Sequence, residues 1–143
     1  MRSDSAMWKY YALLSAFFAA LTAILAKVGV SGINSNLATA IRTTVVLALS
    51  WGIVLAGGSG KQIAALTWKP VLFLIFSGFA TGLSWLCYFK ALELGDVSKV
   101  APIDKLSVVF AMILAFLFLR EPVSVQVLAG GCLILLGSLV ILW

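Results

Sequence analysis

The sequence has 143 residues, of which 63% are hydrophobic and only 10% are charged, and its mean hydropathy is +1.15. Soluble domains carry roughly 25% charged residues, so this composition excludes a soluble globular fold. The net charge is +5, but the basic residues occur singly beside or inside apolar runs, which argues against a nucleic-acid surface and favours membrane anchoring.

Five apolar segments are each long enough to cross a bilayer as a helix, which takes about 20 residues. In chain order we predict helices over residues 8–28, 37–56, 70–90, 99–119 and 123–143. The first is not a cleavable signal peptide, because Lys27 and four further apolar runs follow it. We therefore expect an all-α integral membrane protein with five transmembrane helices, in one domain over residues 1–143, since a second domain would need about a hundred more residues.

The links between these helices carry turn and breaker residues. The first link, 29–36, is rich in Gly, Ser and Asn, and the second, 57–69, opens with Gly-Gly-Ser-Gly and leads to Pro70. Arg120-Glu121-Pro122 separates the last two helices. These signals place the helix boundaries.

Five helices place the two termini on opposite sides of the membrane, and the positive residues then decide the orientation. Each side receives five: Arg2, Lys9, Lys61, Lys69 and Arg120 on the N-terminal side, and Lys27, Arg42, Lys90, Lys99 and Lys105 on the other. Arg42 and Lys105 lie too deep in the membrane to count. Without them, the remaining positive residues slightly favour a cytoplasmic N-terminus. The near balance leads to the hypothesis of a mixed, dual-topology population.

Charged side chains inside a membrane helix are costly, so they are the first candidates for function. Arg42 lies about 7 Å inside the second helix at 1.5 Å per residue. Asp104 and Lys105 lie about one turn inside the fourth, just after Pro102, which predicts a broken helix lining a wet cavity. Because adjacent helical residues point about 100° apart, Asp104 is expected to pair with Arg42 or Lys90 rather than with Lys105.

Together with Lys27, these basic residues predict a positive vestibule around one carboxylate, attractive to anions. Two alternatives remain: Lys27 and Lys90 reach the interface by snorkelling, or the charges form a structural ion pair that fixes helix register. On the third helix, Trp85 and Tyr88 share a face that could line a pocket, and Gly78 and Gly82 form a packing face.

The last helix carries Gly130 and Gly137 seven residues apart on one face. This smooth strip predicts either a dimer contact or packing within the chain. The sequence has no histidine, and Cys87 and Cys132 lack a metal-binding spacing. With no catalytic set in addition, we expect no cofactor, no metal and no enzyme activity.

The segments Leu86–Leu92, Val100–Ile103 and Phe116–Glu121, followed by the glycine-rich last helix, occur in an order that resembles the EamA-type branch of the drug/metabolite transporter superfamily. The resemblance covers the chain as one five-helix unit. Most relatives carry two such units in opposite orientations, which implies that this chain is one half of an inverted-repeat transporter. Its implied partners are a second copy or another single-unit chain, the lipid bilayer of the inner membrane, and a small-molecule solute.

The last helix is also similar to the pairing helix of small multidrug resistance proteins, in which glycines spaced like Gly130 and Gly137 sit at the dimer contact. Those exporters use an acid in the first helix, which this chain lacks between Tyr11 and Ala26. If proton coupling exists, Asp104 is the candidate by its position. We therefore expect a secondary transporter of a small metabolite, and the alternative is a non-transporting accessory or structural membrane subunit.

Overall fold

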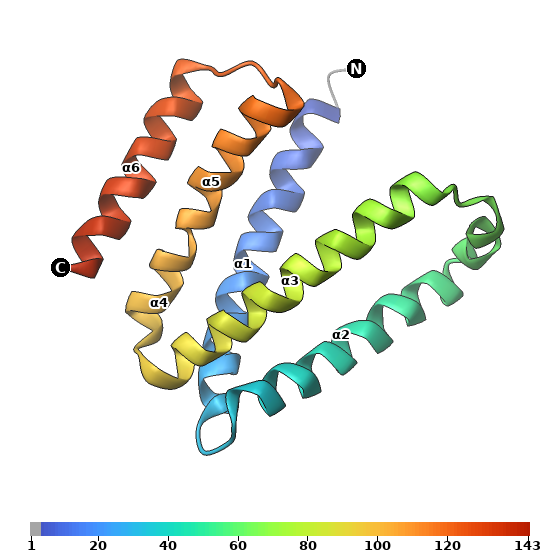
Figure 1. Ribbon diagram of the computed structural model, residues 1–143, viewed down its shortest axis with the longest axis horizontal. Helices are drawn as coiled ribbons and strands as arrows, with labels where there is room; N and C mark the ends of the chain where they lie inside the picture. Colours follow the sequence, from blue (N-terminus) through green and yellow to red (C-terminus); the bar gives the residue numbers. More distant parts are fainter. Residues whose placement is uncertain (1–3) are drawn as a thin grey trace. The chain divides into compact units, whose positions relative to one another are not determined.

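The structure is a computed structural model that describes residues 4–143, with side chains from Met7 onward. It consists of helices joined by short links (Figure 1), and their bounds are α1 Asp4–Val30, α2 Ser35–Ala56, η1 Ser59–Ala65, α3 Trp68–Leu94, α4 Val97–Asp104, α5 Leu106–Leu114, η2 Ala115–Leu119 and α6 Val125–Leu142. Arg2, which entered the count of positive residues, lies outside the described part of the chain.

Five stretches of the described chain are long and apolar enough to cross a membrane: Met7–Val30, Ser35–Ala56, Trp68–Leu94, Val97–Leu119 and Val125–Leu142. The predicted all-α fold with five membrane-spanning helices is thereby confirmed. The third helix extends to Leu94 rather than ending at Lys90. Lys90 and Glu93 therefore lie on consecutive turns of one helix, at a spacing that lets them interact.

The chain divides into two compact units, Met1–Ala23 with Leu94–Trp143 and Ile24–Glu93. In the first unit, α4 and α5 both pack against α6. The packed face of α6 carries Gly131 and Ser138, which are both buried and lie seven residues apart. A Cβ atom at Gly131 would lie 3.1 Å from the Sδ atom of Met112 on α5, so glycine is what lets these helices approach closely.

The connection from α5 to α6 in the first unit is irregular. After α5, the turns widen into the π-helical η2, and Arg120 stops the helix with a left-handed backbone, φ 54°. Pro122 follows two residues later and cannot continue a helix. Ser124 then starts α6, because its side chain accepts a hydrogen bond from the N–H of Val127 at 3.2 Å.

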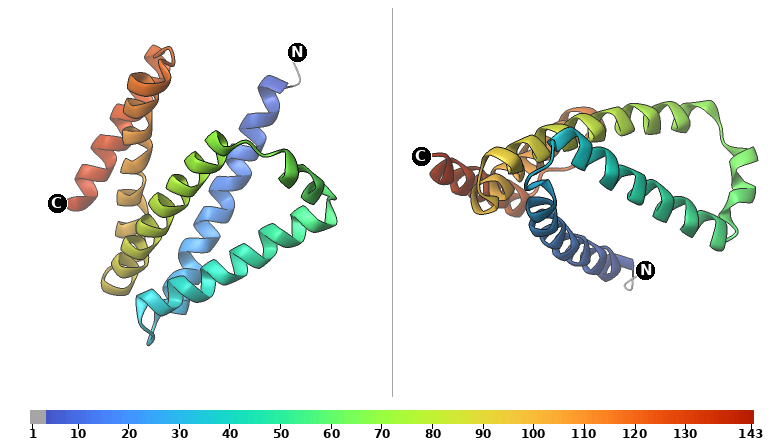
Figure 2. Two further views of the ribbon diagram at one scale, coloured as in Figure 1. Left: turned by 45° about the vertical axis from the view of Figure 1, so that its right-hand side comes forward. Right: turned by 90° about the horizontal axis from the view of Figure 1, so that it is seen from below.

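In the second unit, α2 and α3 run antiparallel and are joined through η1 (Figure 2). The buried apolar side chains gather where α1 ends, α2 begins and α3 ends: Ala26, Val30, Ala38, Phe89 and Leu92. Ala26 and Ala38 add little bulk to this core, so the end of α1 and the start of α2 can approach closely. Most of the large apolar side chains outside it are exposed, as expected for helices whose solvent is lipid.

Candidate functional site

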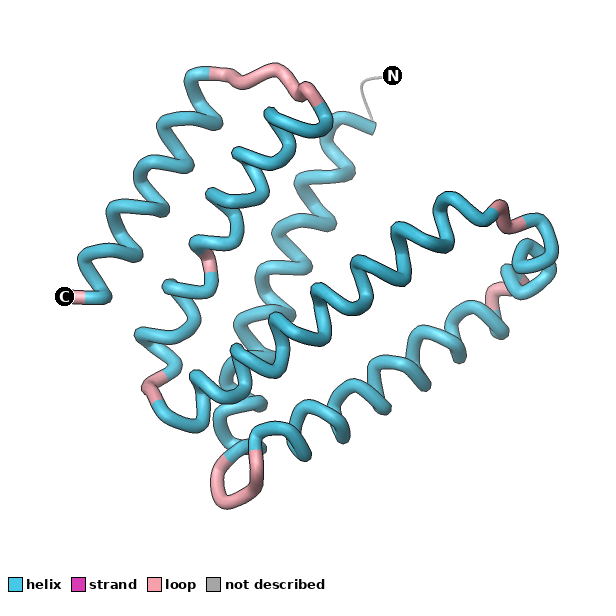
Figure 3. The backbone as a smooth tube through the Cα atoms, viewed as in Figure 1, coloured by secondary structure: helices cyan, strands magenta, loops and turns pink. Residues whose placement is uncertain are grey.

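The predicted break in the fourth helix is confirmed. α4 ends at Asp104 and α5 begins at Leu106, with Lys105 as a turn residue between them (Figure 3). Pro102 lies inside α4 and has no N–H to donate to the preceding turn. The backbone closes around the break with tighter bonds, from Lys105 N–H to the Pro102 carbonyl at 3.1 Å and from Val108 N–H to the Lys105 carbonyl at 3.0 Å.

Asp104 and Lys105 do reach each other, which corrects the prediction that they point apart. The Lys105 Nζ atom lies 3.5 Å from Asp104 Oδ2, with side chains 54% and 37% exposed respectively. The spacing of about 100° per residue holds only in a regular helix, and here the helix is interrupted between the two residues. At this distance and exposure, the ion pair leaves Asp104 available for other partners.

Ser138 of α6 connects to the break. Its hydroxyl donates a hydrogen bond of 3.1 Å to the Pro102 carbonyl oxygen, and the residue is 3% exposed. Ser138 was not among the functional residues predicted from the sequence. Only its position seven residues after Gly131 indicated that it faces the same way.

We expect Ser138→Ala to destabilise the protein by about 0.6 kcal/mol, and by at most about 1.7 kcal/mol, as hydrogen bonds between membrane helices usually do. In this variant the Pro102 carbonyl oxygen loses the Ser138 hydroxyl and accepts only the backbone hydrogen bond from Lys105 N–H. Unfolding in mixed micelles measures the difference. Ser50→Ala is the matched control, because the Ser50 hydroxyl bonds the Val46 carbonyl of its own helix at 2.8 Å. An equal loss in both variants would contradict the prediction.

Arg42 of α2 lies over two aromatic rings of α3. Its Cζ atom is 4.2 Å from the centre of the Trp85 ring and 5.4 Å from the centre of the Phe89 ring. Trp85 and Phe89 are four residues apart and therefore share one face of α3. Phe89 is 2% exposed, whereas Arg42 and Trp85 are half-buried. The aromatic face is thus fixed from behind by the core of the second unit.

Stacking explains how a membrane helix tolerates this arginine. Placing an arginine at the centre of a membrane helix raises the free energy of insertion by about 2.5–3.5 kcal/mol. A desolvated cation–π contact offsets about 2 kcal/mol of this. The salt bridges of the described residues are Lys90–Glu93 and Lys105–Asp104, and neither involves Arg42. The two rings, rather than a carboxylate, are therefore the partners of this guanidinium among these contacts.

A second polar cluster lies at the end of the same unit. Lys27 Nζ donates a 2.6 Å hydrogen bond to the Leu92 carbonyl, in the last turn of α3, where a cation satisfies carbonyls that lack a helical partner. Lys90 Nζ lies 3.0 Å from Glu93 Oε1. The Glu93 carboxylate also accepts hydrogen bonds from the side chain and backbone of Ser35, the first residue of α2.

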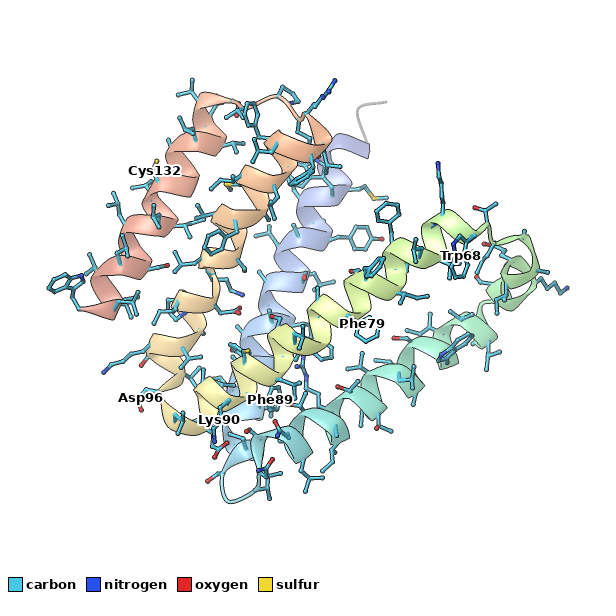
Figure 4. The ribbon with its side chains drawn as sticks, viewed as in Figure 1. Trp68, Phe79, Phe89, Lys90, Asp96 and Cys132 are labelled. Atoms are coloured by element: carbon cyan, nitrogen blue, oxygen red, sulfur yellow. The ribbon has the colours of Figure 1, made fainter. Side chains whose placement is uncertain are left out.

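These contacts join three helix ends. An open cleft of about 640 Å³ adjoins them and is lined by Lys27, Glu93 and the α1–α2 link. Phe89 and Lys90 lie close together near the end of α3, just before the turn that carries Asp96 (Figure 4). We call this cluster of Lys27, Ser35, Lys90 and Glu93 the polar clamp, because it holds three helix ends together. In it, Lys90 pairs with Glu93 and not with Asp104.

The six predicted solute-path residues thus fall into separate groups. Arg42 and Trp85 are brought together, Tyr88 packs edge-on against Phe89 with ring centres 6.5 Å apart, and Lys90 belongs to the clamp. Asp104 and Lys105 form the helix break in the other unit. Phe89 was not predicted as a partner of Arg42. Its spacing of four residues from Trp85 indicates only that both lie on one face of α3.

The glycines of α6 separate by face. Gly131 faces Met112 inside the first unit, whereas a Cβ atom at Gly130 or Gly137 would meet nothing within 4 Å. A Cβ atom at Gly78 or Gly82 on α3 would likewise meet nothing within 4 Å. Packing within the first unit therefore uses Gly131 and Ser138, whereas Gly137 is exposed and Gly130 is partly exposed.

Residues 6–143 match the profile of the EamA-like transporter family. The chain belongs to this family. Among similar proteins, the "Uncharacterized transporter in cobO 3'region" of a Sinorhizobium species is 49% identical over 137 residues, which cover 96% of this chain and 97% of that protein. The "Uncharacterized transporter YvbV" of Bacillus subtilis is 29% identical over 85 residues, which cover 57% of this chain and 28% of that longer protein. No solved structure matches.

The EamA-like chain is therefore a multi-pass membrane protein of a transporter family. Its relative from Sinorhizobium has nearly the same length as one five-helix unit. Among the described side chains, no three His, Cys, Asp or Glu residues converge on a point where a metal could bind. Asp104 and Lys105 lie at the break between α4 and α5, and Arg42 lies over aromatic rings of α3.

Proposed function

We propose that this protein is a secondary transporter that carries a small metabolite across a bacterial inner membrane, working as an inverted dimer by alternating access. We place the N-terminus in the cytoplasm in one copy and on the opposite side in the other. A dual orientation follows from the near-equal numbers of positive residues assigned to the two sides. Solute binding is assigned to Arg42, Trp85 and Tyr88, and coupling to Asp104 with Lys105.

The observation that carries this proposal is the broken membrane helix at Asp104 and Lys105. Backbone groups at such a break lack regular helical partners, and a membrane protein tolerates them only where protein or water surrounds them. Secondary transporters place solute and ion sites at discontinuous helices of this kind. A carboxylate and an ammonium at the break supply a group that can change its charge during transport.

The open glycine faces support a dimer. Gly130 and Gly137 leave a smooth surface on α6 that its own unit does not cover. Without a hydrophobic driving force in lipid, close backbone approach is a main source of helix association. An inverted pair would also complete the two-unit architecture that the family resemblance implies.

A disulfide cross-link tests the dimer. In a background with Cys87 and Cys132 replaced by alanine, a variant with both Gly130→Cys and Gly137→Cys should form a covalent dimer in native membranes under oxidising conditions. In antiparallel α6 helices, Gly130 of one copy lies level with Gly137 of the other, within reach of a disulfide. Leu128→Cys with Leu139→Cys is the control, because both positions lie about 200° round the helix from the two glycines. Monomer alone from the glycine pair, or equal cross-linking of both pairs, would count against the α6 contact.

Orientation is tested in the same background. A cysteine placed in the exposed link at Ser59 should react with membrane-impermeant maleimide from both sides, each in part of the population. Reaction from one side only would exclude an inverted homodimer. A different single-unit chain would then have to supply the second half, and co-purification from native membranes would identify it.

A further inference from the structure

We infer that the stacked Arg42 is the binding site for a carboxylate group of the transported solute, so that the substrate is an organic anion or a zwitterion with a free carboxylate. This inference rests on the proposed transport function and names its substrate class. It is carried by the geometry of Arg42, Trp85 and Phe89, which is independent of the helix break.

The two aromatic rings hold the guanidinium without neutralising it. The Arg42 Cζ atom lies over both rings, 4.2 Å from the centre of the Trp85 ring and 5.4 Å from the centre of the Phe89 ring. The N–H donors of a guanidinium lie in its plane and point outward, where they match the two oxygens of a carboxylate. Neither ring supplies such oxygens, so a solute carboxylate can take this place.

Charge also points to an anion. Arg42 makes no salt bridge within the described residues, whereas Lys90 and Lys105 each have a carboxylate nearby. One unneutralised guanidinium in a low-dielectric setting favours a ligand with one negative charge. A monocarboxylate supplies that charge and two acceptor oxygens together.

Depth and access fit the same role. Arg42 is seven residues into α2, or about 10 Å along the helix at 1.5 Å per residue. It is half-buried, with the buried Phe89 behind it. The polar clamp of Lys27, Ser35 and Glu93 lies at the end of the same helix pair, beside an open cleft. A solute carboxylate entering from that end would reach Arg42 about two turns further in.

Protection against chemical modification tests the site directly. Purified protein in nanodiscs is treated with p-hydroxyphenylglyoxal, and the labelling rate of Arg42 is followed by peptide mass spectrometry with Arg120 as the internal reference. Benzoate should slow labelling of Arg42 roughly tenfold at saturation, as expected for a bidentate pair, with no effect on Arg120. Benzamide, which has the same shape without the charge, should leave both rates unchanged.

Matched variants separate stacking from charge. Trp85→Phe should retain the protection by benzoate, whereas Trp85→Leu should lose most of it, and Trp51→Leu on α2 should behave like the wild type. Equal protection by benzamide would overturn the inference, as would protection by phenylphosphonate without protection by benzoate. An Arg42 that resists labelling until Asp104 is replaced by Asn would also overturn it, because Arg42 would then be neutralised by the protein.

Flux through proteoliposomes distinguishes failure of this inference from failure of the transport function. Benzoate and a pool of neutral sugars and amides are offered separately. Movement of the carboxylate in the wild type and in Arg120→Lys, with its loss in Arg42→Lys, supports the inference. If the neutral solutes move and their movement does not depend on Arg42, the inference about the carboxylate is overturned, whereas the proposed transport function is supported. Protection by benzoate without flux of any solute overturns the transport function alone.

Discussion

Replacing Asp104 by Asn is expected to abolish solute movement while the protein remains folded. Asparagine preserves the size and hydrogen-bonding capacity of the side chain at the break but cannot carry a charge or exchange a proton. The ion pair with Lys105 is long and more than one-third exposed, so its loss should change the free energy of unfolding by less than about 1 kcal/mol. The measurement is pH change inside dye-loaded proteoliposomes when amino acids, carboxylates or sugars are added.

Asp96→Asn is the matched control for this experiment. Asp96 precedes α4 as its N-cap residue and makes no side-chain capping hydrogen bond, so the same chemical change outside the break should leave transport intact. An equal loss of solute movement in Asp104→Asn and Asp96→Asn would contradict a specific role of Asp104 in transport. If the wild type moves no solute at all, the alternative of an accessory or structural subunit is favoured, in which the charged pairs only hold helices together.

Gly131→Leu is expected to destabilise the packing of α5 against α6 more than leucine at the other glycines of α6. Even a Cβ atom would lie 3.1 Å from Met112 Sδ, so a whole leucine side chain must push α5 and α6 apart. Overpacking of this kind costs about 1–3 kcal/mol, and the displacement would also stretch the hydrogen bond between Ser138 and Pro102. We would measure the unfolding transition in mixed micelles by circular dichroism.

Gly130→Leu provides the comparison, since nothing lies within 4 Å of the position of its Cβ atom. The unfolding transition of this variant should match the wild type or lie above it, because leucine favours a helix by up to about 1 kcal/mol relative to glycine. If the strip is a dimer contact, the dimer fraction of this variant in native membranes, measured with an amine-reactive cross-linker, should fall sharply. A double variant with Met112→Ala should restore much of the stability lost in Gly131→Leu, and failure to do so would contradict the proposed steric cause.

The sequence by itself was sufficient for the fold class. Five apolar runs of membrane-spanning length, separated by Gly, Asn and Pro signals, predicted the five helices because a bilayer requires length and apolarity above all. Pro102 with Asp104 predicted the broken helix, because proline removes a backbone donor wherever it lies inside a helix. The order of motifs indicated the family, which the match over residues 6–143 confirms.

Tertiary structure alone decided which residues meet. Periodicity placed Gly130 and Gly131 on neighbouring faces of α6, but only the packed helices show that Gly131 faces Met112. It could not place Phe89 behind Arg42, because that contact depends on how α2 and α3 cross. The partner of Lys90 was misassigned because the third helix was expected to end at Lys90, whereas α3 continues to Leu94 and places Glu93 one turn further on. The partner of Lys105 was misassigned because the helix is interrupted between Asp104 and Leu106, where regular helical spacing no longer applies.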